Sequence, residues 1–436
     1  MEILSALKLE LFRSKRKILM LYAANAPFGG NIVGIEAASW RYLGKSPYDL
    51  SWAEAASLSV LPNSPRLVFP GKNQDQLKTK RDNLLKKMYA RGFFDSLTLE
   101  LAMDEPIPAE PEQMPMLAPH LTDYFYISSG GKHIKTTIDP EIQARATEII
   151  NLRQKELSGK LINNLACLIV SVGTGDVLAY VGNSKTDNPS ANGGDVDIIR
   201  ASRSSGRILK PFLYAAMQNS GELLTDALIA DIPTRFQGFS PKNFNKDYSG
   251  AVPASRALAQ SLNIPAVKML QSFTAEKFID VLKKSGFSTF NQPADYYGLS
   301  LILGGGETTL WELTGAYASL SRTLKNYNLE NKYFIEDIHQ PVLIDGEMAE
   351  QSKTENPEPV LSAGSIWLTY EALRKVNRPE EESGWQFFSS PGEIAWKTGT
   401  SYGFRDAWAV GSTPDYVVGV WAGNADGEGR PGLTGI

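Results

Sequence analysis

The 436-residue sequence has one cysteine and three histidines. A single cysteine excludes an internal disulfide, and because Cys167 lies in the apolar run 165–172 we expect a buried, unreactive thiol. His120, His133 and His339 are scattered, without the spacing of metal ligands. The sequence therefore predicts no metal site, and nothing in it indicates a cofactor.

Long apolar runs and a strong excess of one charge are also missing. No segment approaches the roughly 18 consecutive apolar residues of a membrane span, and charges from Lys8 onward interrupt the first segment too early for a signal peptide. The net charge of −4 gives no reason to expect nucleic acid. As written, the chain carries no export signal or anchor, so we expect any membrane attachment to come from a segment upstream of Met1.

Prolines divide the sequence into two parts. Five of them cluster between residues 104 and 120, which is typical of a stiff, extended linker. We therefore place domains at 1–104 and 134–436, with a proline-rich linker at 105–133. The first domain is predicted to be all-α: residues 2–24 and 74–91 have helical periodicity, and Ser51 with Glu54 forms a capping box.

The second domain has strands at both ends and helices between them. Strands are expected at 134–138, 165–172, 177–181, 394–401, 406–411 and 416–423. A helix should start at Pro140 with Asp139 as its N-cap, and others are expected from Lys210 and over 254–270, 274–285 and 308–324. This order predicts an α+β fold, a sheet with a helical insertion.

One strand carries residues suited to binding a carboxylate. Lys397, Thr398, Gly399 and Thr400 place an ammonium and two hydroxyls beside a residue without a side chain. We expect Gly399 to let an extended peptide lie against the backbone, while the cation and hydroxyls hold the peptide's carboxylate. Alone, the tripeptide is more often an ordinary strand end.

Two further segments support a functional interpretation of Lys397-Thr398-Gly399. Upstream lie a loop that enters a helix at Lys210, and the triplet Ser261-Leu262-Asn263. The ordered motifs S-x-x-K, S-D-N and K-T-G are the signature of β-lactamases and penicillin-binding proteins. The third motif matches in full and the second keeps its serine and asparagine, but Arg207 stands where the first requires a nucleophilic serine.

The sequence resembles the class A penicillin-binding proteins over nearly its whole length. From residue 135 onward it resembles their transpeptidase domain, and its first 45 residues resemble the latter half of their peptidoglycan glycosyltransferase domain. The resemblance implies an internal piece of a bifunctional synthase that acts at the periplasmic face of the inner membrane. The matching runs are EILSALKLE (2–10), SKRKILMLYAANAPFGG (14–30), GIEAASWRYLGK (34–45), TIDPEIQ (137–143), GTGDVLAY (173–180), LKPFLY (209–214), SLNIPAV (261–267), GLSLILGGG (298–306) and KTGTSYGFRDAW (397–408).

By this resemblance the reaction is acyl transfer on D-Ala-D-Ala stem peptides, and β-lactams are ligands of the same site. A serine attacks the penultimate D-alanine carbonyl, D-alanine leaves, and an amine resolves the acyl-enzyme into a crosslink. The implied roles are base for Lys210, proton relay for Ser261, amide binding for Asn263, carboxylate binding for Lys397, Thr398 and Thr400, and an oxyanion hole from the backbone N–H groups of Arg207 and Thr400.

The resemblance also aligns Glu2 with one of the two carboxylates that flank the reacting glycosidic centre in the glycosyltransferase. The other carboxylate would lie upstream of Met1. Because a two-carboxylate mechanism needs both groups, we expect no glycosyl transfer from this chain.

Arg207 leaves the function open. A guanidinium stays protonated and cannot form an acyl-enzyme, while Ser204 and Ser205 precede the helix and lack the one-turn register to Lys210. A third cation beside Lys210 and Lys397 would favour anion binding. The alternatives are a D,D-transpeptidase, a catalytically dead scaffold that binds penicillin or stem peptides, and a D,D-carboxypeptidase or β-lactamase-like hydrolase. The helical first region and the linker argue against the hydrolase.

Overall fold

The chain folds as two compact units, Met1–Met116 and Leu117–Ile436. The computed structural model describes residues 2–112, 116–130, 132–185, 192–236, 240–243, 247–347, 353–375 and 394–433. In these ranges no helix combines the length and the apolar character that a bilayer crossing requires.

The first unit is helical, as predicted, apart from one small hairpin. Ser51 and Glu54 form the expected capping box: the Ser51 hydroxyl accepts from the Glu54 N–H at 3.1 Å, and the Glu54 carboxylate accepts from the Ser51 N–H at 2.7 Å. The hairpin was not predicted; the positive φ angles of Gly29 and Gly30 permit its tight turn. The elements are α1 (Glu2–Phe12), α2 (Lys15–Asn25), β1 (Pro27–Gly29), β2 (Ile32–Val33), α3 (Ile35–Leu43), α4 (Trp52–Val60), α5 (Gln74–Ala90) and α6 (Ser96–Asp104).

The segment 105–133, expected to be an extended linker, differs in its second half. It contains helix α7 (Pro119–Ser129), which starts with proline at its first position and ends at Gly130 in the left-handed conformation. Leu121 of this helix is buried in the core of the second unit. Proline suits the first turn of a helix as well as a linker, so proline content alone did not separate the two.

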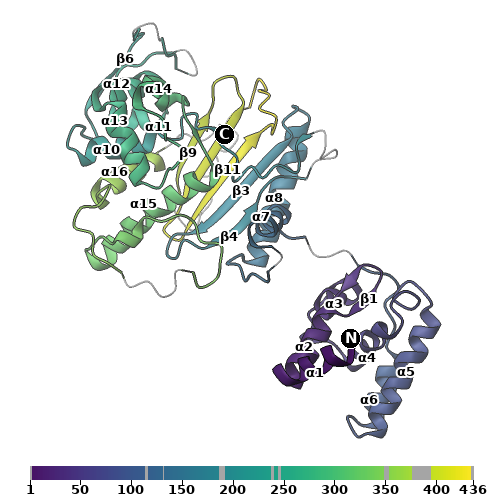
Figure 1. The fold of residues 1–436 in the computed structure, drawn as a ribbon. Helices are drawn as coiled ribbons and strands as arrows, with labels where there is room; N and C mark the ends of the chain where they lie inside the picture. Colours follow the sequence, from purple (N-terminus) through teal and green to yellow (C-terminus); the bar gives the residue numbers. More distant parts are fainter. Residues whose placement is uncertain are drawn as a thin grey trace. The chain divides into compact units, whose positions relative to one another are not determined.

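The second unit is an antiparallel sheet with helices inserted between its first and last strands, which confirms the predicted α+β order (Figure 1). The strands run β4-β3-β11-β10-β9 across the sheet. They are β3 (Asn164–Ser171), β4 (Val177–Val181), β9 (Ala395–Thr400), β10 (Asp406–Ser412) and β11 (Tyr416–Gly423). The helices are α8 (Pro140–Ser158), α10 (Lys210–Asn219), α11 (Ala254–Ala259), α12 (Asn263–Phe273), α13 (Ala275–Lys284), α14 (Ala294–Tyr297), α15 (Leu310–Glu330) and α16 (Ala363–Arg374).

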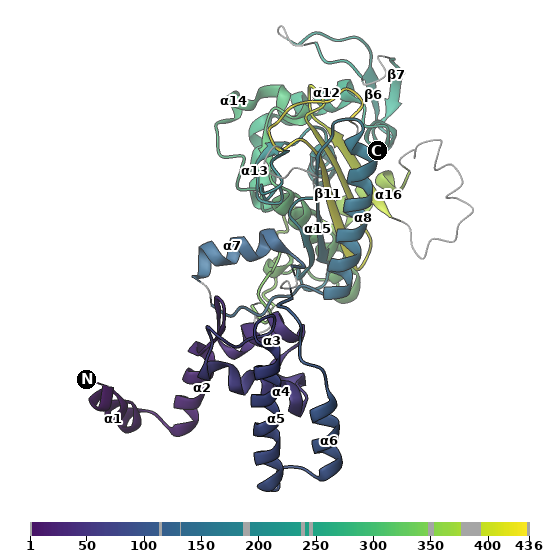
Figure 2. The ribbon, with the colours of Figure 1, turned by 90° about the vertical axis from the view of Figure 1, so that its right-hand side faces the viewer.

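Alternation along β3 gives the sheet two buried faces. Leu168 and Val170 pack into the large core that contains α10 and α15, whereas Cys167 packs with Ala146 and Ile150 of α8 (Figure 2). Burial raises the pKa of the Cys167 thiol to about 12, which agrees with the inert thiol expected from the sequence.

Two predicted elements were wrong in detail. Residues 134–138 form no strand; Thr136 makes a single bridge to Ile344, closed by the hydrogen bonds from the Thr137 N–H to the Leu343 carbonyl and from the Asp345 N–H to the Lys135 carbonyl. The helix expected over 254–270 is split into α11 and α12. It breaks at Ser261, where φ is +54°.

Candidate active site

Three segments that are far apart in the sequence meet in the second unit. They are the turn that leads into α10, the junction between α11 and α12, and strand β9. Lys210 of α10 donates to the main chain of the junction, and Lys397 of β9 donates to the side chain of Ser261. The structure thus brings together the three motifs that the sequence singled out.

Arg207 lies in the helical turn just before α10. The Ile208 N–H donates to the Ser205 carbonyl at 3.2 Å, and the Lys210 N–H donates to the Arg207 carbonyl at 3.4 Å. Position 207 is therefore one turn ahead of Lys210. The guanidinium is half-buried, and this burial lowers the pKa of Arg207 below its usual value.

Lys210 is almost completely buried, with 1% of its surface exposed. Its Nζ donates to the Ser261 carbonyl at 2.7 Å, the Leu262 carbonyl at 2.9 Å and Asn263 Oδ1 at 2.9 Å. Three acceptors match the three N–H bonds of an ammonium, whereas a neutral amine has only two. Burial, then the charge of Arg207, then that of Lys397 hold the pKa of Lys210 well below its usual value.

The junction between α11 and α12 has the hydrogen bonds of a Schellman motif. The Ser261 N–H donates to the Leu258 carbonyl and the Leu262 N–H to the Ala257 carbonyl, both at 2.9 Å. Ser261 occupies the left-handed position of this motif, where glycine is usual and any other residue costs about 1–2 kcal/mol. A serine kept at this cost points to a use for its hydroxyl.

Both ends of the Asn263 amide bond to other parts of the chain. Its Oδ1 accepts from Lys210, its Nδ2 donates to the Lys242 carbonyl at 2.7 Å, and its backbone N–H donates to Asn243 Oδ1 at 2.9 Å. For binding a substrate amide, the role that the resemblance implies, the second N–H of Nδ2 and the second lone pair of Oδ1 remain. Lys242 and Asn243 could not be predicted from the sequence because no motif marks their loop.

Lys397 is as buried as Lys210 but has fewer acceptors among the described contacts. Its Nζ donates to Ser261 Oγ at 2.9 Å and to the carbonyl of Thr398. Burial, followed by the charge of Arg207, lowers the pKa of Lys397 to about 7. Near neutral pH this amine therefore exists in both protonation states, which is the condition for a proton-transfer group.

Strand β9 is at the end of the sheet. Within the described residues it pairs only with β10, and we call the edge that no described strand pairs the open edge. The Ser401 N–H donates to the Asp406 carbonyl at 2.9 Å, and because N–H directions alternate along a strand, the Thr400 N–H points toward the open edge. Side chains alternate too: Lys397 and Gly399 are buried, while Thr398 and Thr400 lie on the opposite face.

Gly399 has a different role from the one predicted. A Cβ added there would lie 2.9 Å from the Ile208 nitrogen and 3.2 Å from the Arg207 nitrogen. The missing side chain thus lets β9 approach the turn before α10, rather than leaving room on that face for a ligand peptide. An extended ligand would instead reach β9 from its open edge.

The two serines before position 207 do not face the lysines. Ser204 Oγ donates to the Gly304 carbonyl at 2.8 Å, and the buried Ser205 Oγ donates to the Gly306 carbonyl at 3.0 Å. Both hydroxyls thus contribute to packing against residues 304–306, and neither replaces the missing nucleophile.

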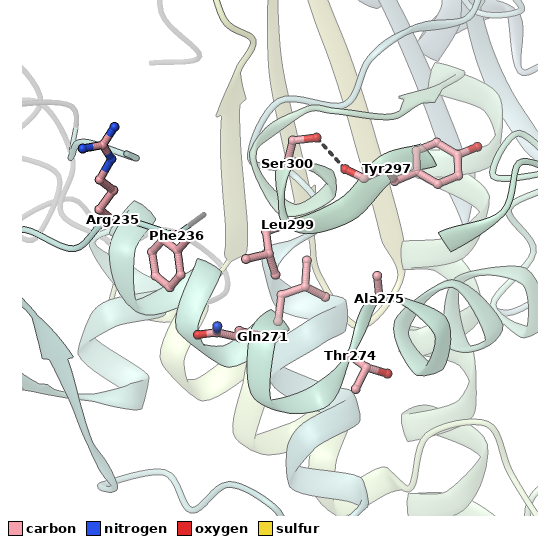
Figure 3. A pocket seen from close by; sticks show the side chains of 9 residues that line it. Arg235, Phe236, Gln271, Thr274, Ala275, Tyr297, Leu299 and Ser300 are labelled. Carbon is pink, nitrogen blue, oxygen red and sulfur yellow. Dashed lines mark hydrogen bonds between the residues drawn. The ribbon is translucent and has the colours of Figure 1, made fainter. Parts of the chain in front are cut away.

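Two hollows lie near these helices. One, of about 450 Å³, borders Ser204, Gly304 and Glu307 beside the segment that leads into α10. The other, of about 670 Å³, is lined by none of the predicted site residues; Figure 3 shows Arg235, Phe236, Gln271, Thr274 and Tyr297 around it. In the first unit, Glu2 begins α1, and its side chain lies outside the part that the structure describes.

Comparison with protein families gives two matches in the same order as the two units. The transglycosylase family model matches residues 1–89, and the penicillin binding protein transpeptidase domain matches residues 165–430. Penicillin-binding protein 1C of Escherichia coli (strain K12) is 35% identical over 431 residues, which cover 99% of this chain and 53% of that protein. The chain thus spans about half the length of this relative.

Solved structures agree on the fold. Penicillin-binding protein 1A from Haemophilus influenzae matches with a TM-score of 0.61 at 18% identity, over 97% of this chain and 83% of that one. Penicillin-binding protein PonA1 from Mycobacterium tuberculosis matches with a TM-score of 0.52 at 19% identity, over 73% of this chain and 87% of that one. With a transglycosylase match followed by a transpeptidase domain that covers most of its length, the chain belongs to the class A penicillin-binding proteins.

Proposed function

We propose that the second unit binds the D-Ala-D-Ala end of peptidoglycan stem peptides, and β-lactams in the same place, as part of peptidoglycan synthesis. The observation that carries this proposal is the hydrogen-bonded set Lys210, Ser261 and Lys397 beside the open edge of β9. A buried lysine on the last strand of a sheet suits a peptide that ends in a carboxylate. In support, the M. tuberculosis PonA1 structure is a complex with penicillin V.

The domain assignment follows from the same family. We assign 1–104 to the latter part of a peptidoglycan glycosyltransferase domain and 134–436 to the transpeptidase domain, in line with the matches over 1–89 and 165–430. The place of action is the periplasmic face of the inner membrane, where the substrate of such synthases is assembled into the cell wall.

The first candidate reaction is D,D-transpeptidation through an acyl-enzyme. A ligand strand along the open edge of β9 would bring its penultimate carbonyl to the turn before α10, where the backbone N–H groups of Arg207 and Thr400 would stabilise the oxyanion. Lys210 is placed to accept a proton from a hydroxyl at position 207, and Ser261 to pass one to the departing D-alanine. Lys397 would bind the carboxylate from one face of β9, and Thr398 and Thr400, on the opposite face, would act only on a carboxylate that extends past the strand edge.

Arg207 favours a second candidate, reversible binding without acylation. The guanidinium supplies no acyl-forming hydroxyl, and its charge acts on both buried lysines. The added positive charge of Arg207 would strengthen the binding of a ligand carboxylate without supplying a nucleophile. The hydrolase alternative receives less support, because a carboxypeptidase or β-lactamase has no use for the transglycosylase match over 1–89.

Calorimetric titration with a diacetylated tripeptide that ends in D-Ala-D-Ala tests the proposal. We expect binding to the free carboxylate and at least a tenfold loss with the C-terminal amide, because a charge-assisted bond is worth roughly 1.5–3 kcal/mol. Lys397→Met should lose the same preference. Equal affinity for acid and amide would contradict a carboxylate site at β9.

Mass spectrometry of the products separates the two candidates. The donor peptide is incubated with the protein alone and then with an acceptor amine. A crosslinked product supports transpeptidation and a shortened peptide supports hydrolysis, whereas unchanged donor that nevertheless binds supports the scaffold.

A further inference from the structure

Ser261 carries a hydroxyl that contacts a buried amine. Its Oγ lies 2.9 Å from Lys397 Nζ, and its own carbonyl accepts from Lys210 Nζ at 2.7 Å. A hydroxyl beside a buried lysine is the arrangement of a serine–lysine dyad, in which the amine removes the proton as the oxygen attacks.

The other hydroxyls around position 207 are placed less well. Ser204 and Ser205 donate to backbone carbonyls of residues 304–306. Thr398 and Thr400 alternate with Lys397 along β9 and so lie on the face away from its amine. Geometry thus separates Ser261, which shares a hydrogen bond with the base, from its neighbours.

The surrounding charges favour attack by this oxygen. Lys210 is held next to Ser261, and the positive charge of Arg207 acts on both lysines. Negative charge that develops on the Ser261 oxygen would be stabilised by a protonated Lys210, which is bonded to the carbonyl of the same residue. Lys397, whose pKa is lowered to about 7, has a neutral fraction able to accept the proton at ordinary pH.

We propose that Ser261, with Lys397 as its base, is the residue of this chain that β-lactams and D-Ala-D-Ala peptides acylate. The proposal rests on the proposed function, since it requires that the cleft bind these ligands. The Ser261 Oγ–acyl bond forms as the ligand amide C–N bond breaks. The hydroxyl proton passes to Lys397 Nζ and from there to the departing nitrogen, so protons and electrons balance without a further reactant.

Backbone geometry supports the proposal and provides a clean variant. Ser261 has φ of +54° at the position of a Schellman motif where glycine is usual. Glycine would relieve this strain, so the choice of serine preserves a hydroxyl. Ser261→Gly therefore removes the proposed nucleophile and leaves a backbone that suits its fold.

The experiment is intact-mass spectrometry after incubation with penicillin V, followed by peptide mapping. The full chain, Ser261→Gly, Lys397→Met and Ser204→Ala are compared, each checked for folding by circular dichroism. We expect one equivalent of adduct on Ser261 in the full chain and in Ser204→Ala, and none in the other two. The rate of adduct formation should rise with pH through about 7, as the amine of Lys397 loses its proton.

Equilibrium dialysis with the same penicillin measures reversible binding, so that a failure to acylate can be distinguished from a failure to bind. Ligand bound without any adduct would overturn the role of Ser261 and leave the proposed binding function standing. Adduct that maps to another residue would overturn it as well. If the folded chain shows no adduct and no binding, that result contradicts the proposed function and this inference with it.

Discussion

The turn before α10 and the edge strand β9 each bring a buried lysine to the same place, but they hold it differently. Lys210 has three oxygen acceptors from the α11–α12 junction. Lys397 has one hydroxyl and the carbonyl of Thr398. Burial lowers the pKa of both, yet only the first has a full set of partners for its charged form.

The difference separates a lysine with three acceptors from one with a hydroxyl and a single carbonyl. Lys210 joins α10 to the junction, so its hydrogen bonds are part of the packing. Lys397 donates to a hydroxyl and lies on the last strand of the sheet. With Arg207 ahead of Lys210, the α10 side has no hydroxyl at position 207, whereas the β9 side has an amine hydrogen-bonded to one.

Arg207→Ser should have the largest effect on the difference between the α10 side and the β9 side, because it places a hydroxyl one turn before Lys210. We expect the rate of acylation by penicillin to rise by at least roughly 10³-fold, since removing a serine nucleophile from a catalytic set costs up to about 10⁶-fold. Stopped-flow mixing with a fluorescent penicillin gives the rate, and peptide mapping should place the adduct at position 207.

Arg207→Ala is the matched control, since it removes the same cation and adds no hydroxyl. If it accelerates acylation as much as Arg207→Ser does, the gain comes from the lost charge alone. If Arg207→Ser stays inert although folded, the turn before α10 does not present position 207 to the ligand.

Lys210→Ala should destabilise the second unit more than Lys397→Ala. The first change leaves three buried acceptors without a donor, and we expect a loss of about 3–5 kcal/mol in the free energy of unfolding. The second leaves Ser261 able to reorient its hydroxyl, so about 1–2 kcal/mol is expected. Differential scanning calorimetry on the two variants measures both, and equal losses would contradict the distinction between the two lysines.

The sequence predicted the architecture of the second unit well, because strong local signals act there. Apolar runs at 165–172 and 416–423, and Asp139 before Pro140, produce the strands and the helix that they indicate. Residues 134–138 were also predicted to be a strand, but they run beside Leu343 and form no ladder. Whether a segment forms a strand depends also on the segment it pairs with, which no local sequence pattern encodes.

The site was foreseeable as a set of motifs but not as a network. Their order along the chain pointed to Lys210, Ser261 and Lys397. No pattern could show that Gly399 faces the backbone of Ile208, or that Ser261 adopts a left-handed conformation, since both follow from the tertiary packing. The hydrogen bond between Lys397 and the Ser261 hydroxyl also depends on the tertiary packing, so only the structure shows it.

The stability of the second unit should depend on pH through Lys397. Its pKa is about 7 in the folded chain, whereas an unperturbed lysine has a pKa of 10.5, so between these values the unfolded chain binds more protons. Stability therefore increases as pH rises from 7 to 10.5, by at most about 1.4 kcal/mol per pH unit from this group. Urea unfolding at several pH values measures the slope.

Lys210 contributes with the same sign, so the informative comparison is with Lys397→Met, which keeps Lys210. That variant should have a smaller slope over this window. Arg207→Ala should also reduce the dependence, because removing the nearby charge lets the pKa of Lys397 rise toward its usual value. An unchanged slope in both variants would contradict the low pKa of this amine.

The smallest expected effect compares two replacements of Ser261. Both Ser261→Gly and Ser261→Ala remove the hydrogen bond from Lys397, but only glycine also relieves the left-handed backbone. We expect Ser261→Gly to be more stable than Ser261→Ala by about 1 kcal/mol in urea unfolding at pH 7. Since neither variant has a nucleophile at this position, both should fail to form the adduct. The two variants would then differ in the free energy of unfolding but not in acylation. That result would indicate that serine at this position supplies a hydroxyl and lowers the stability of the fold.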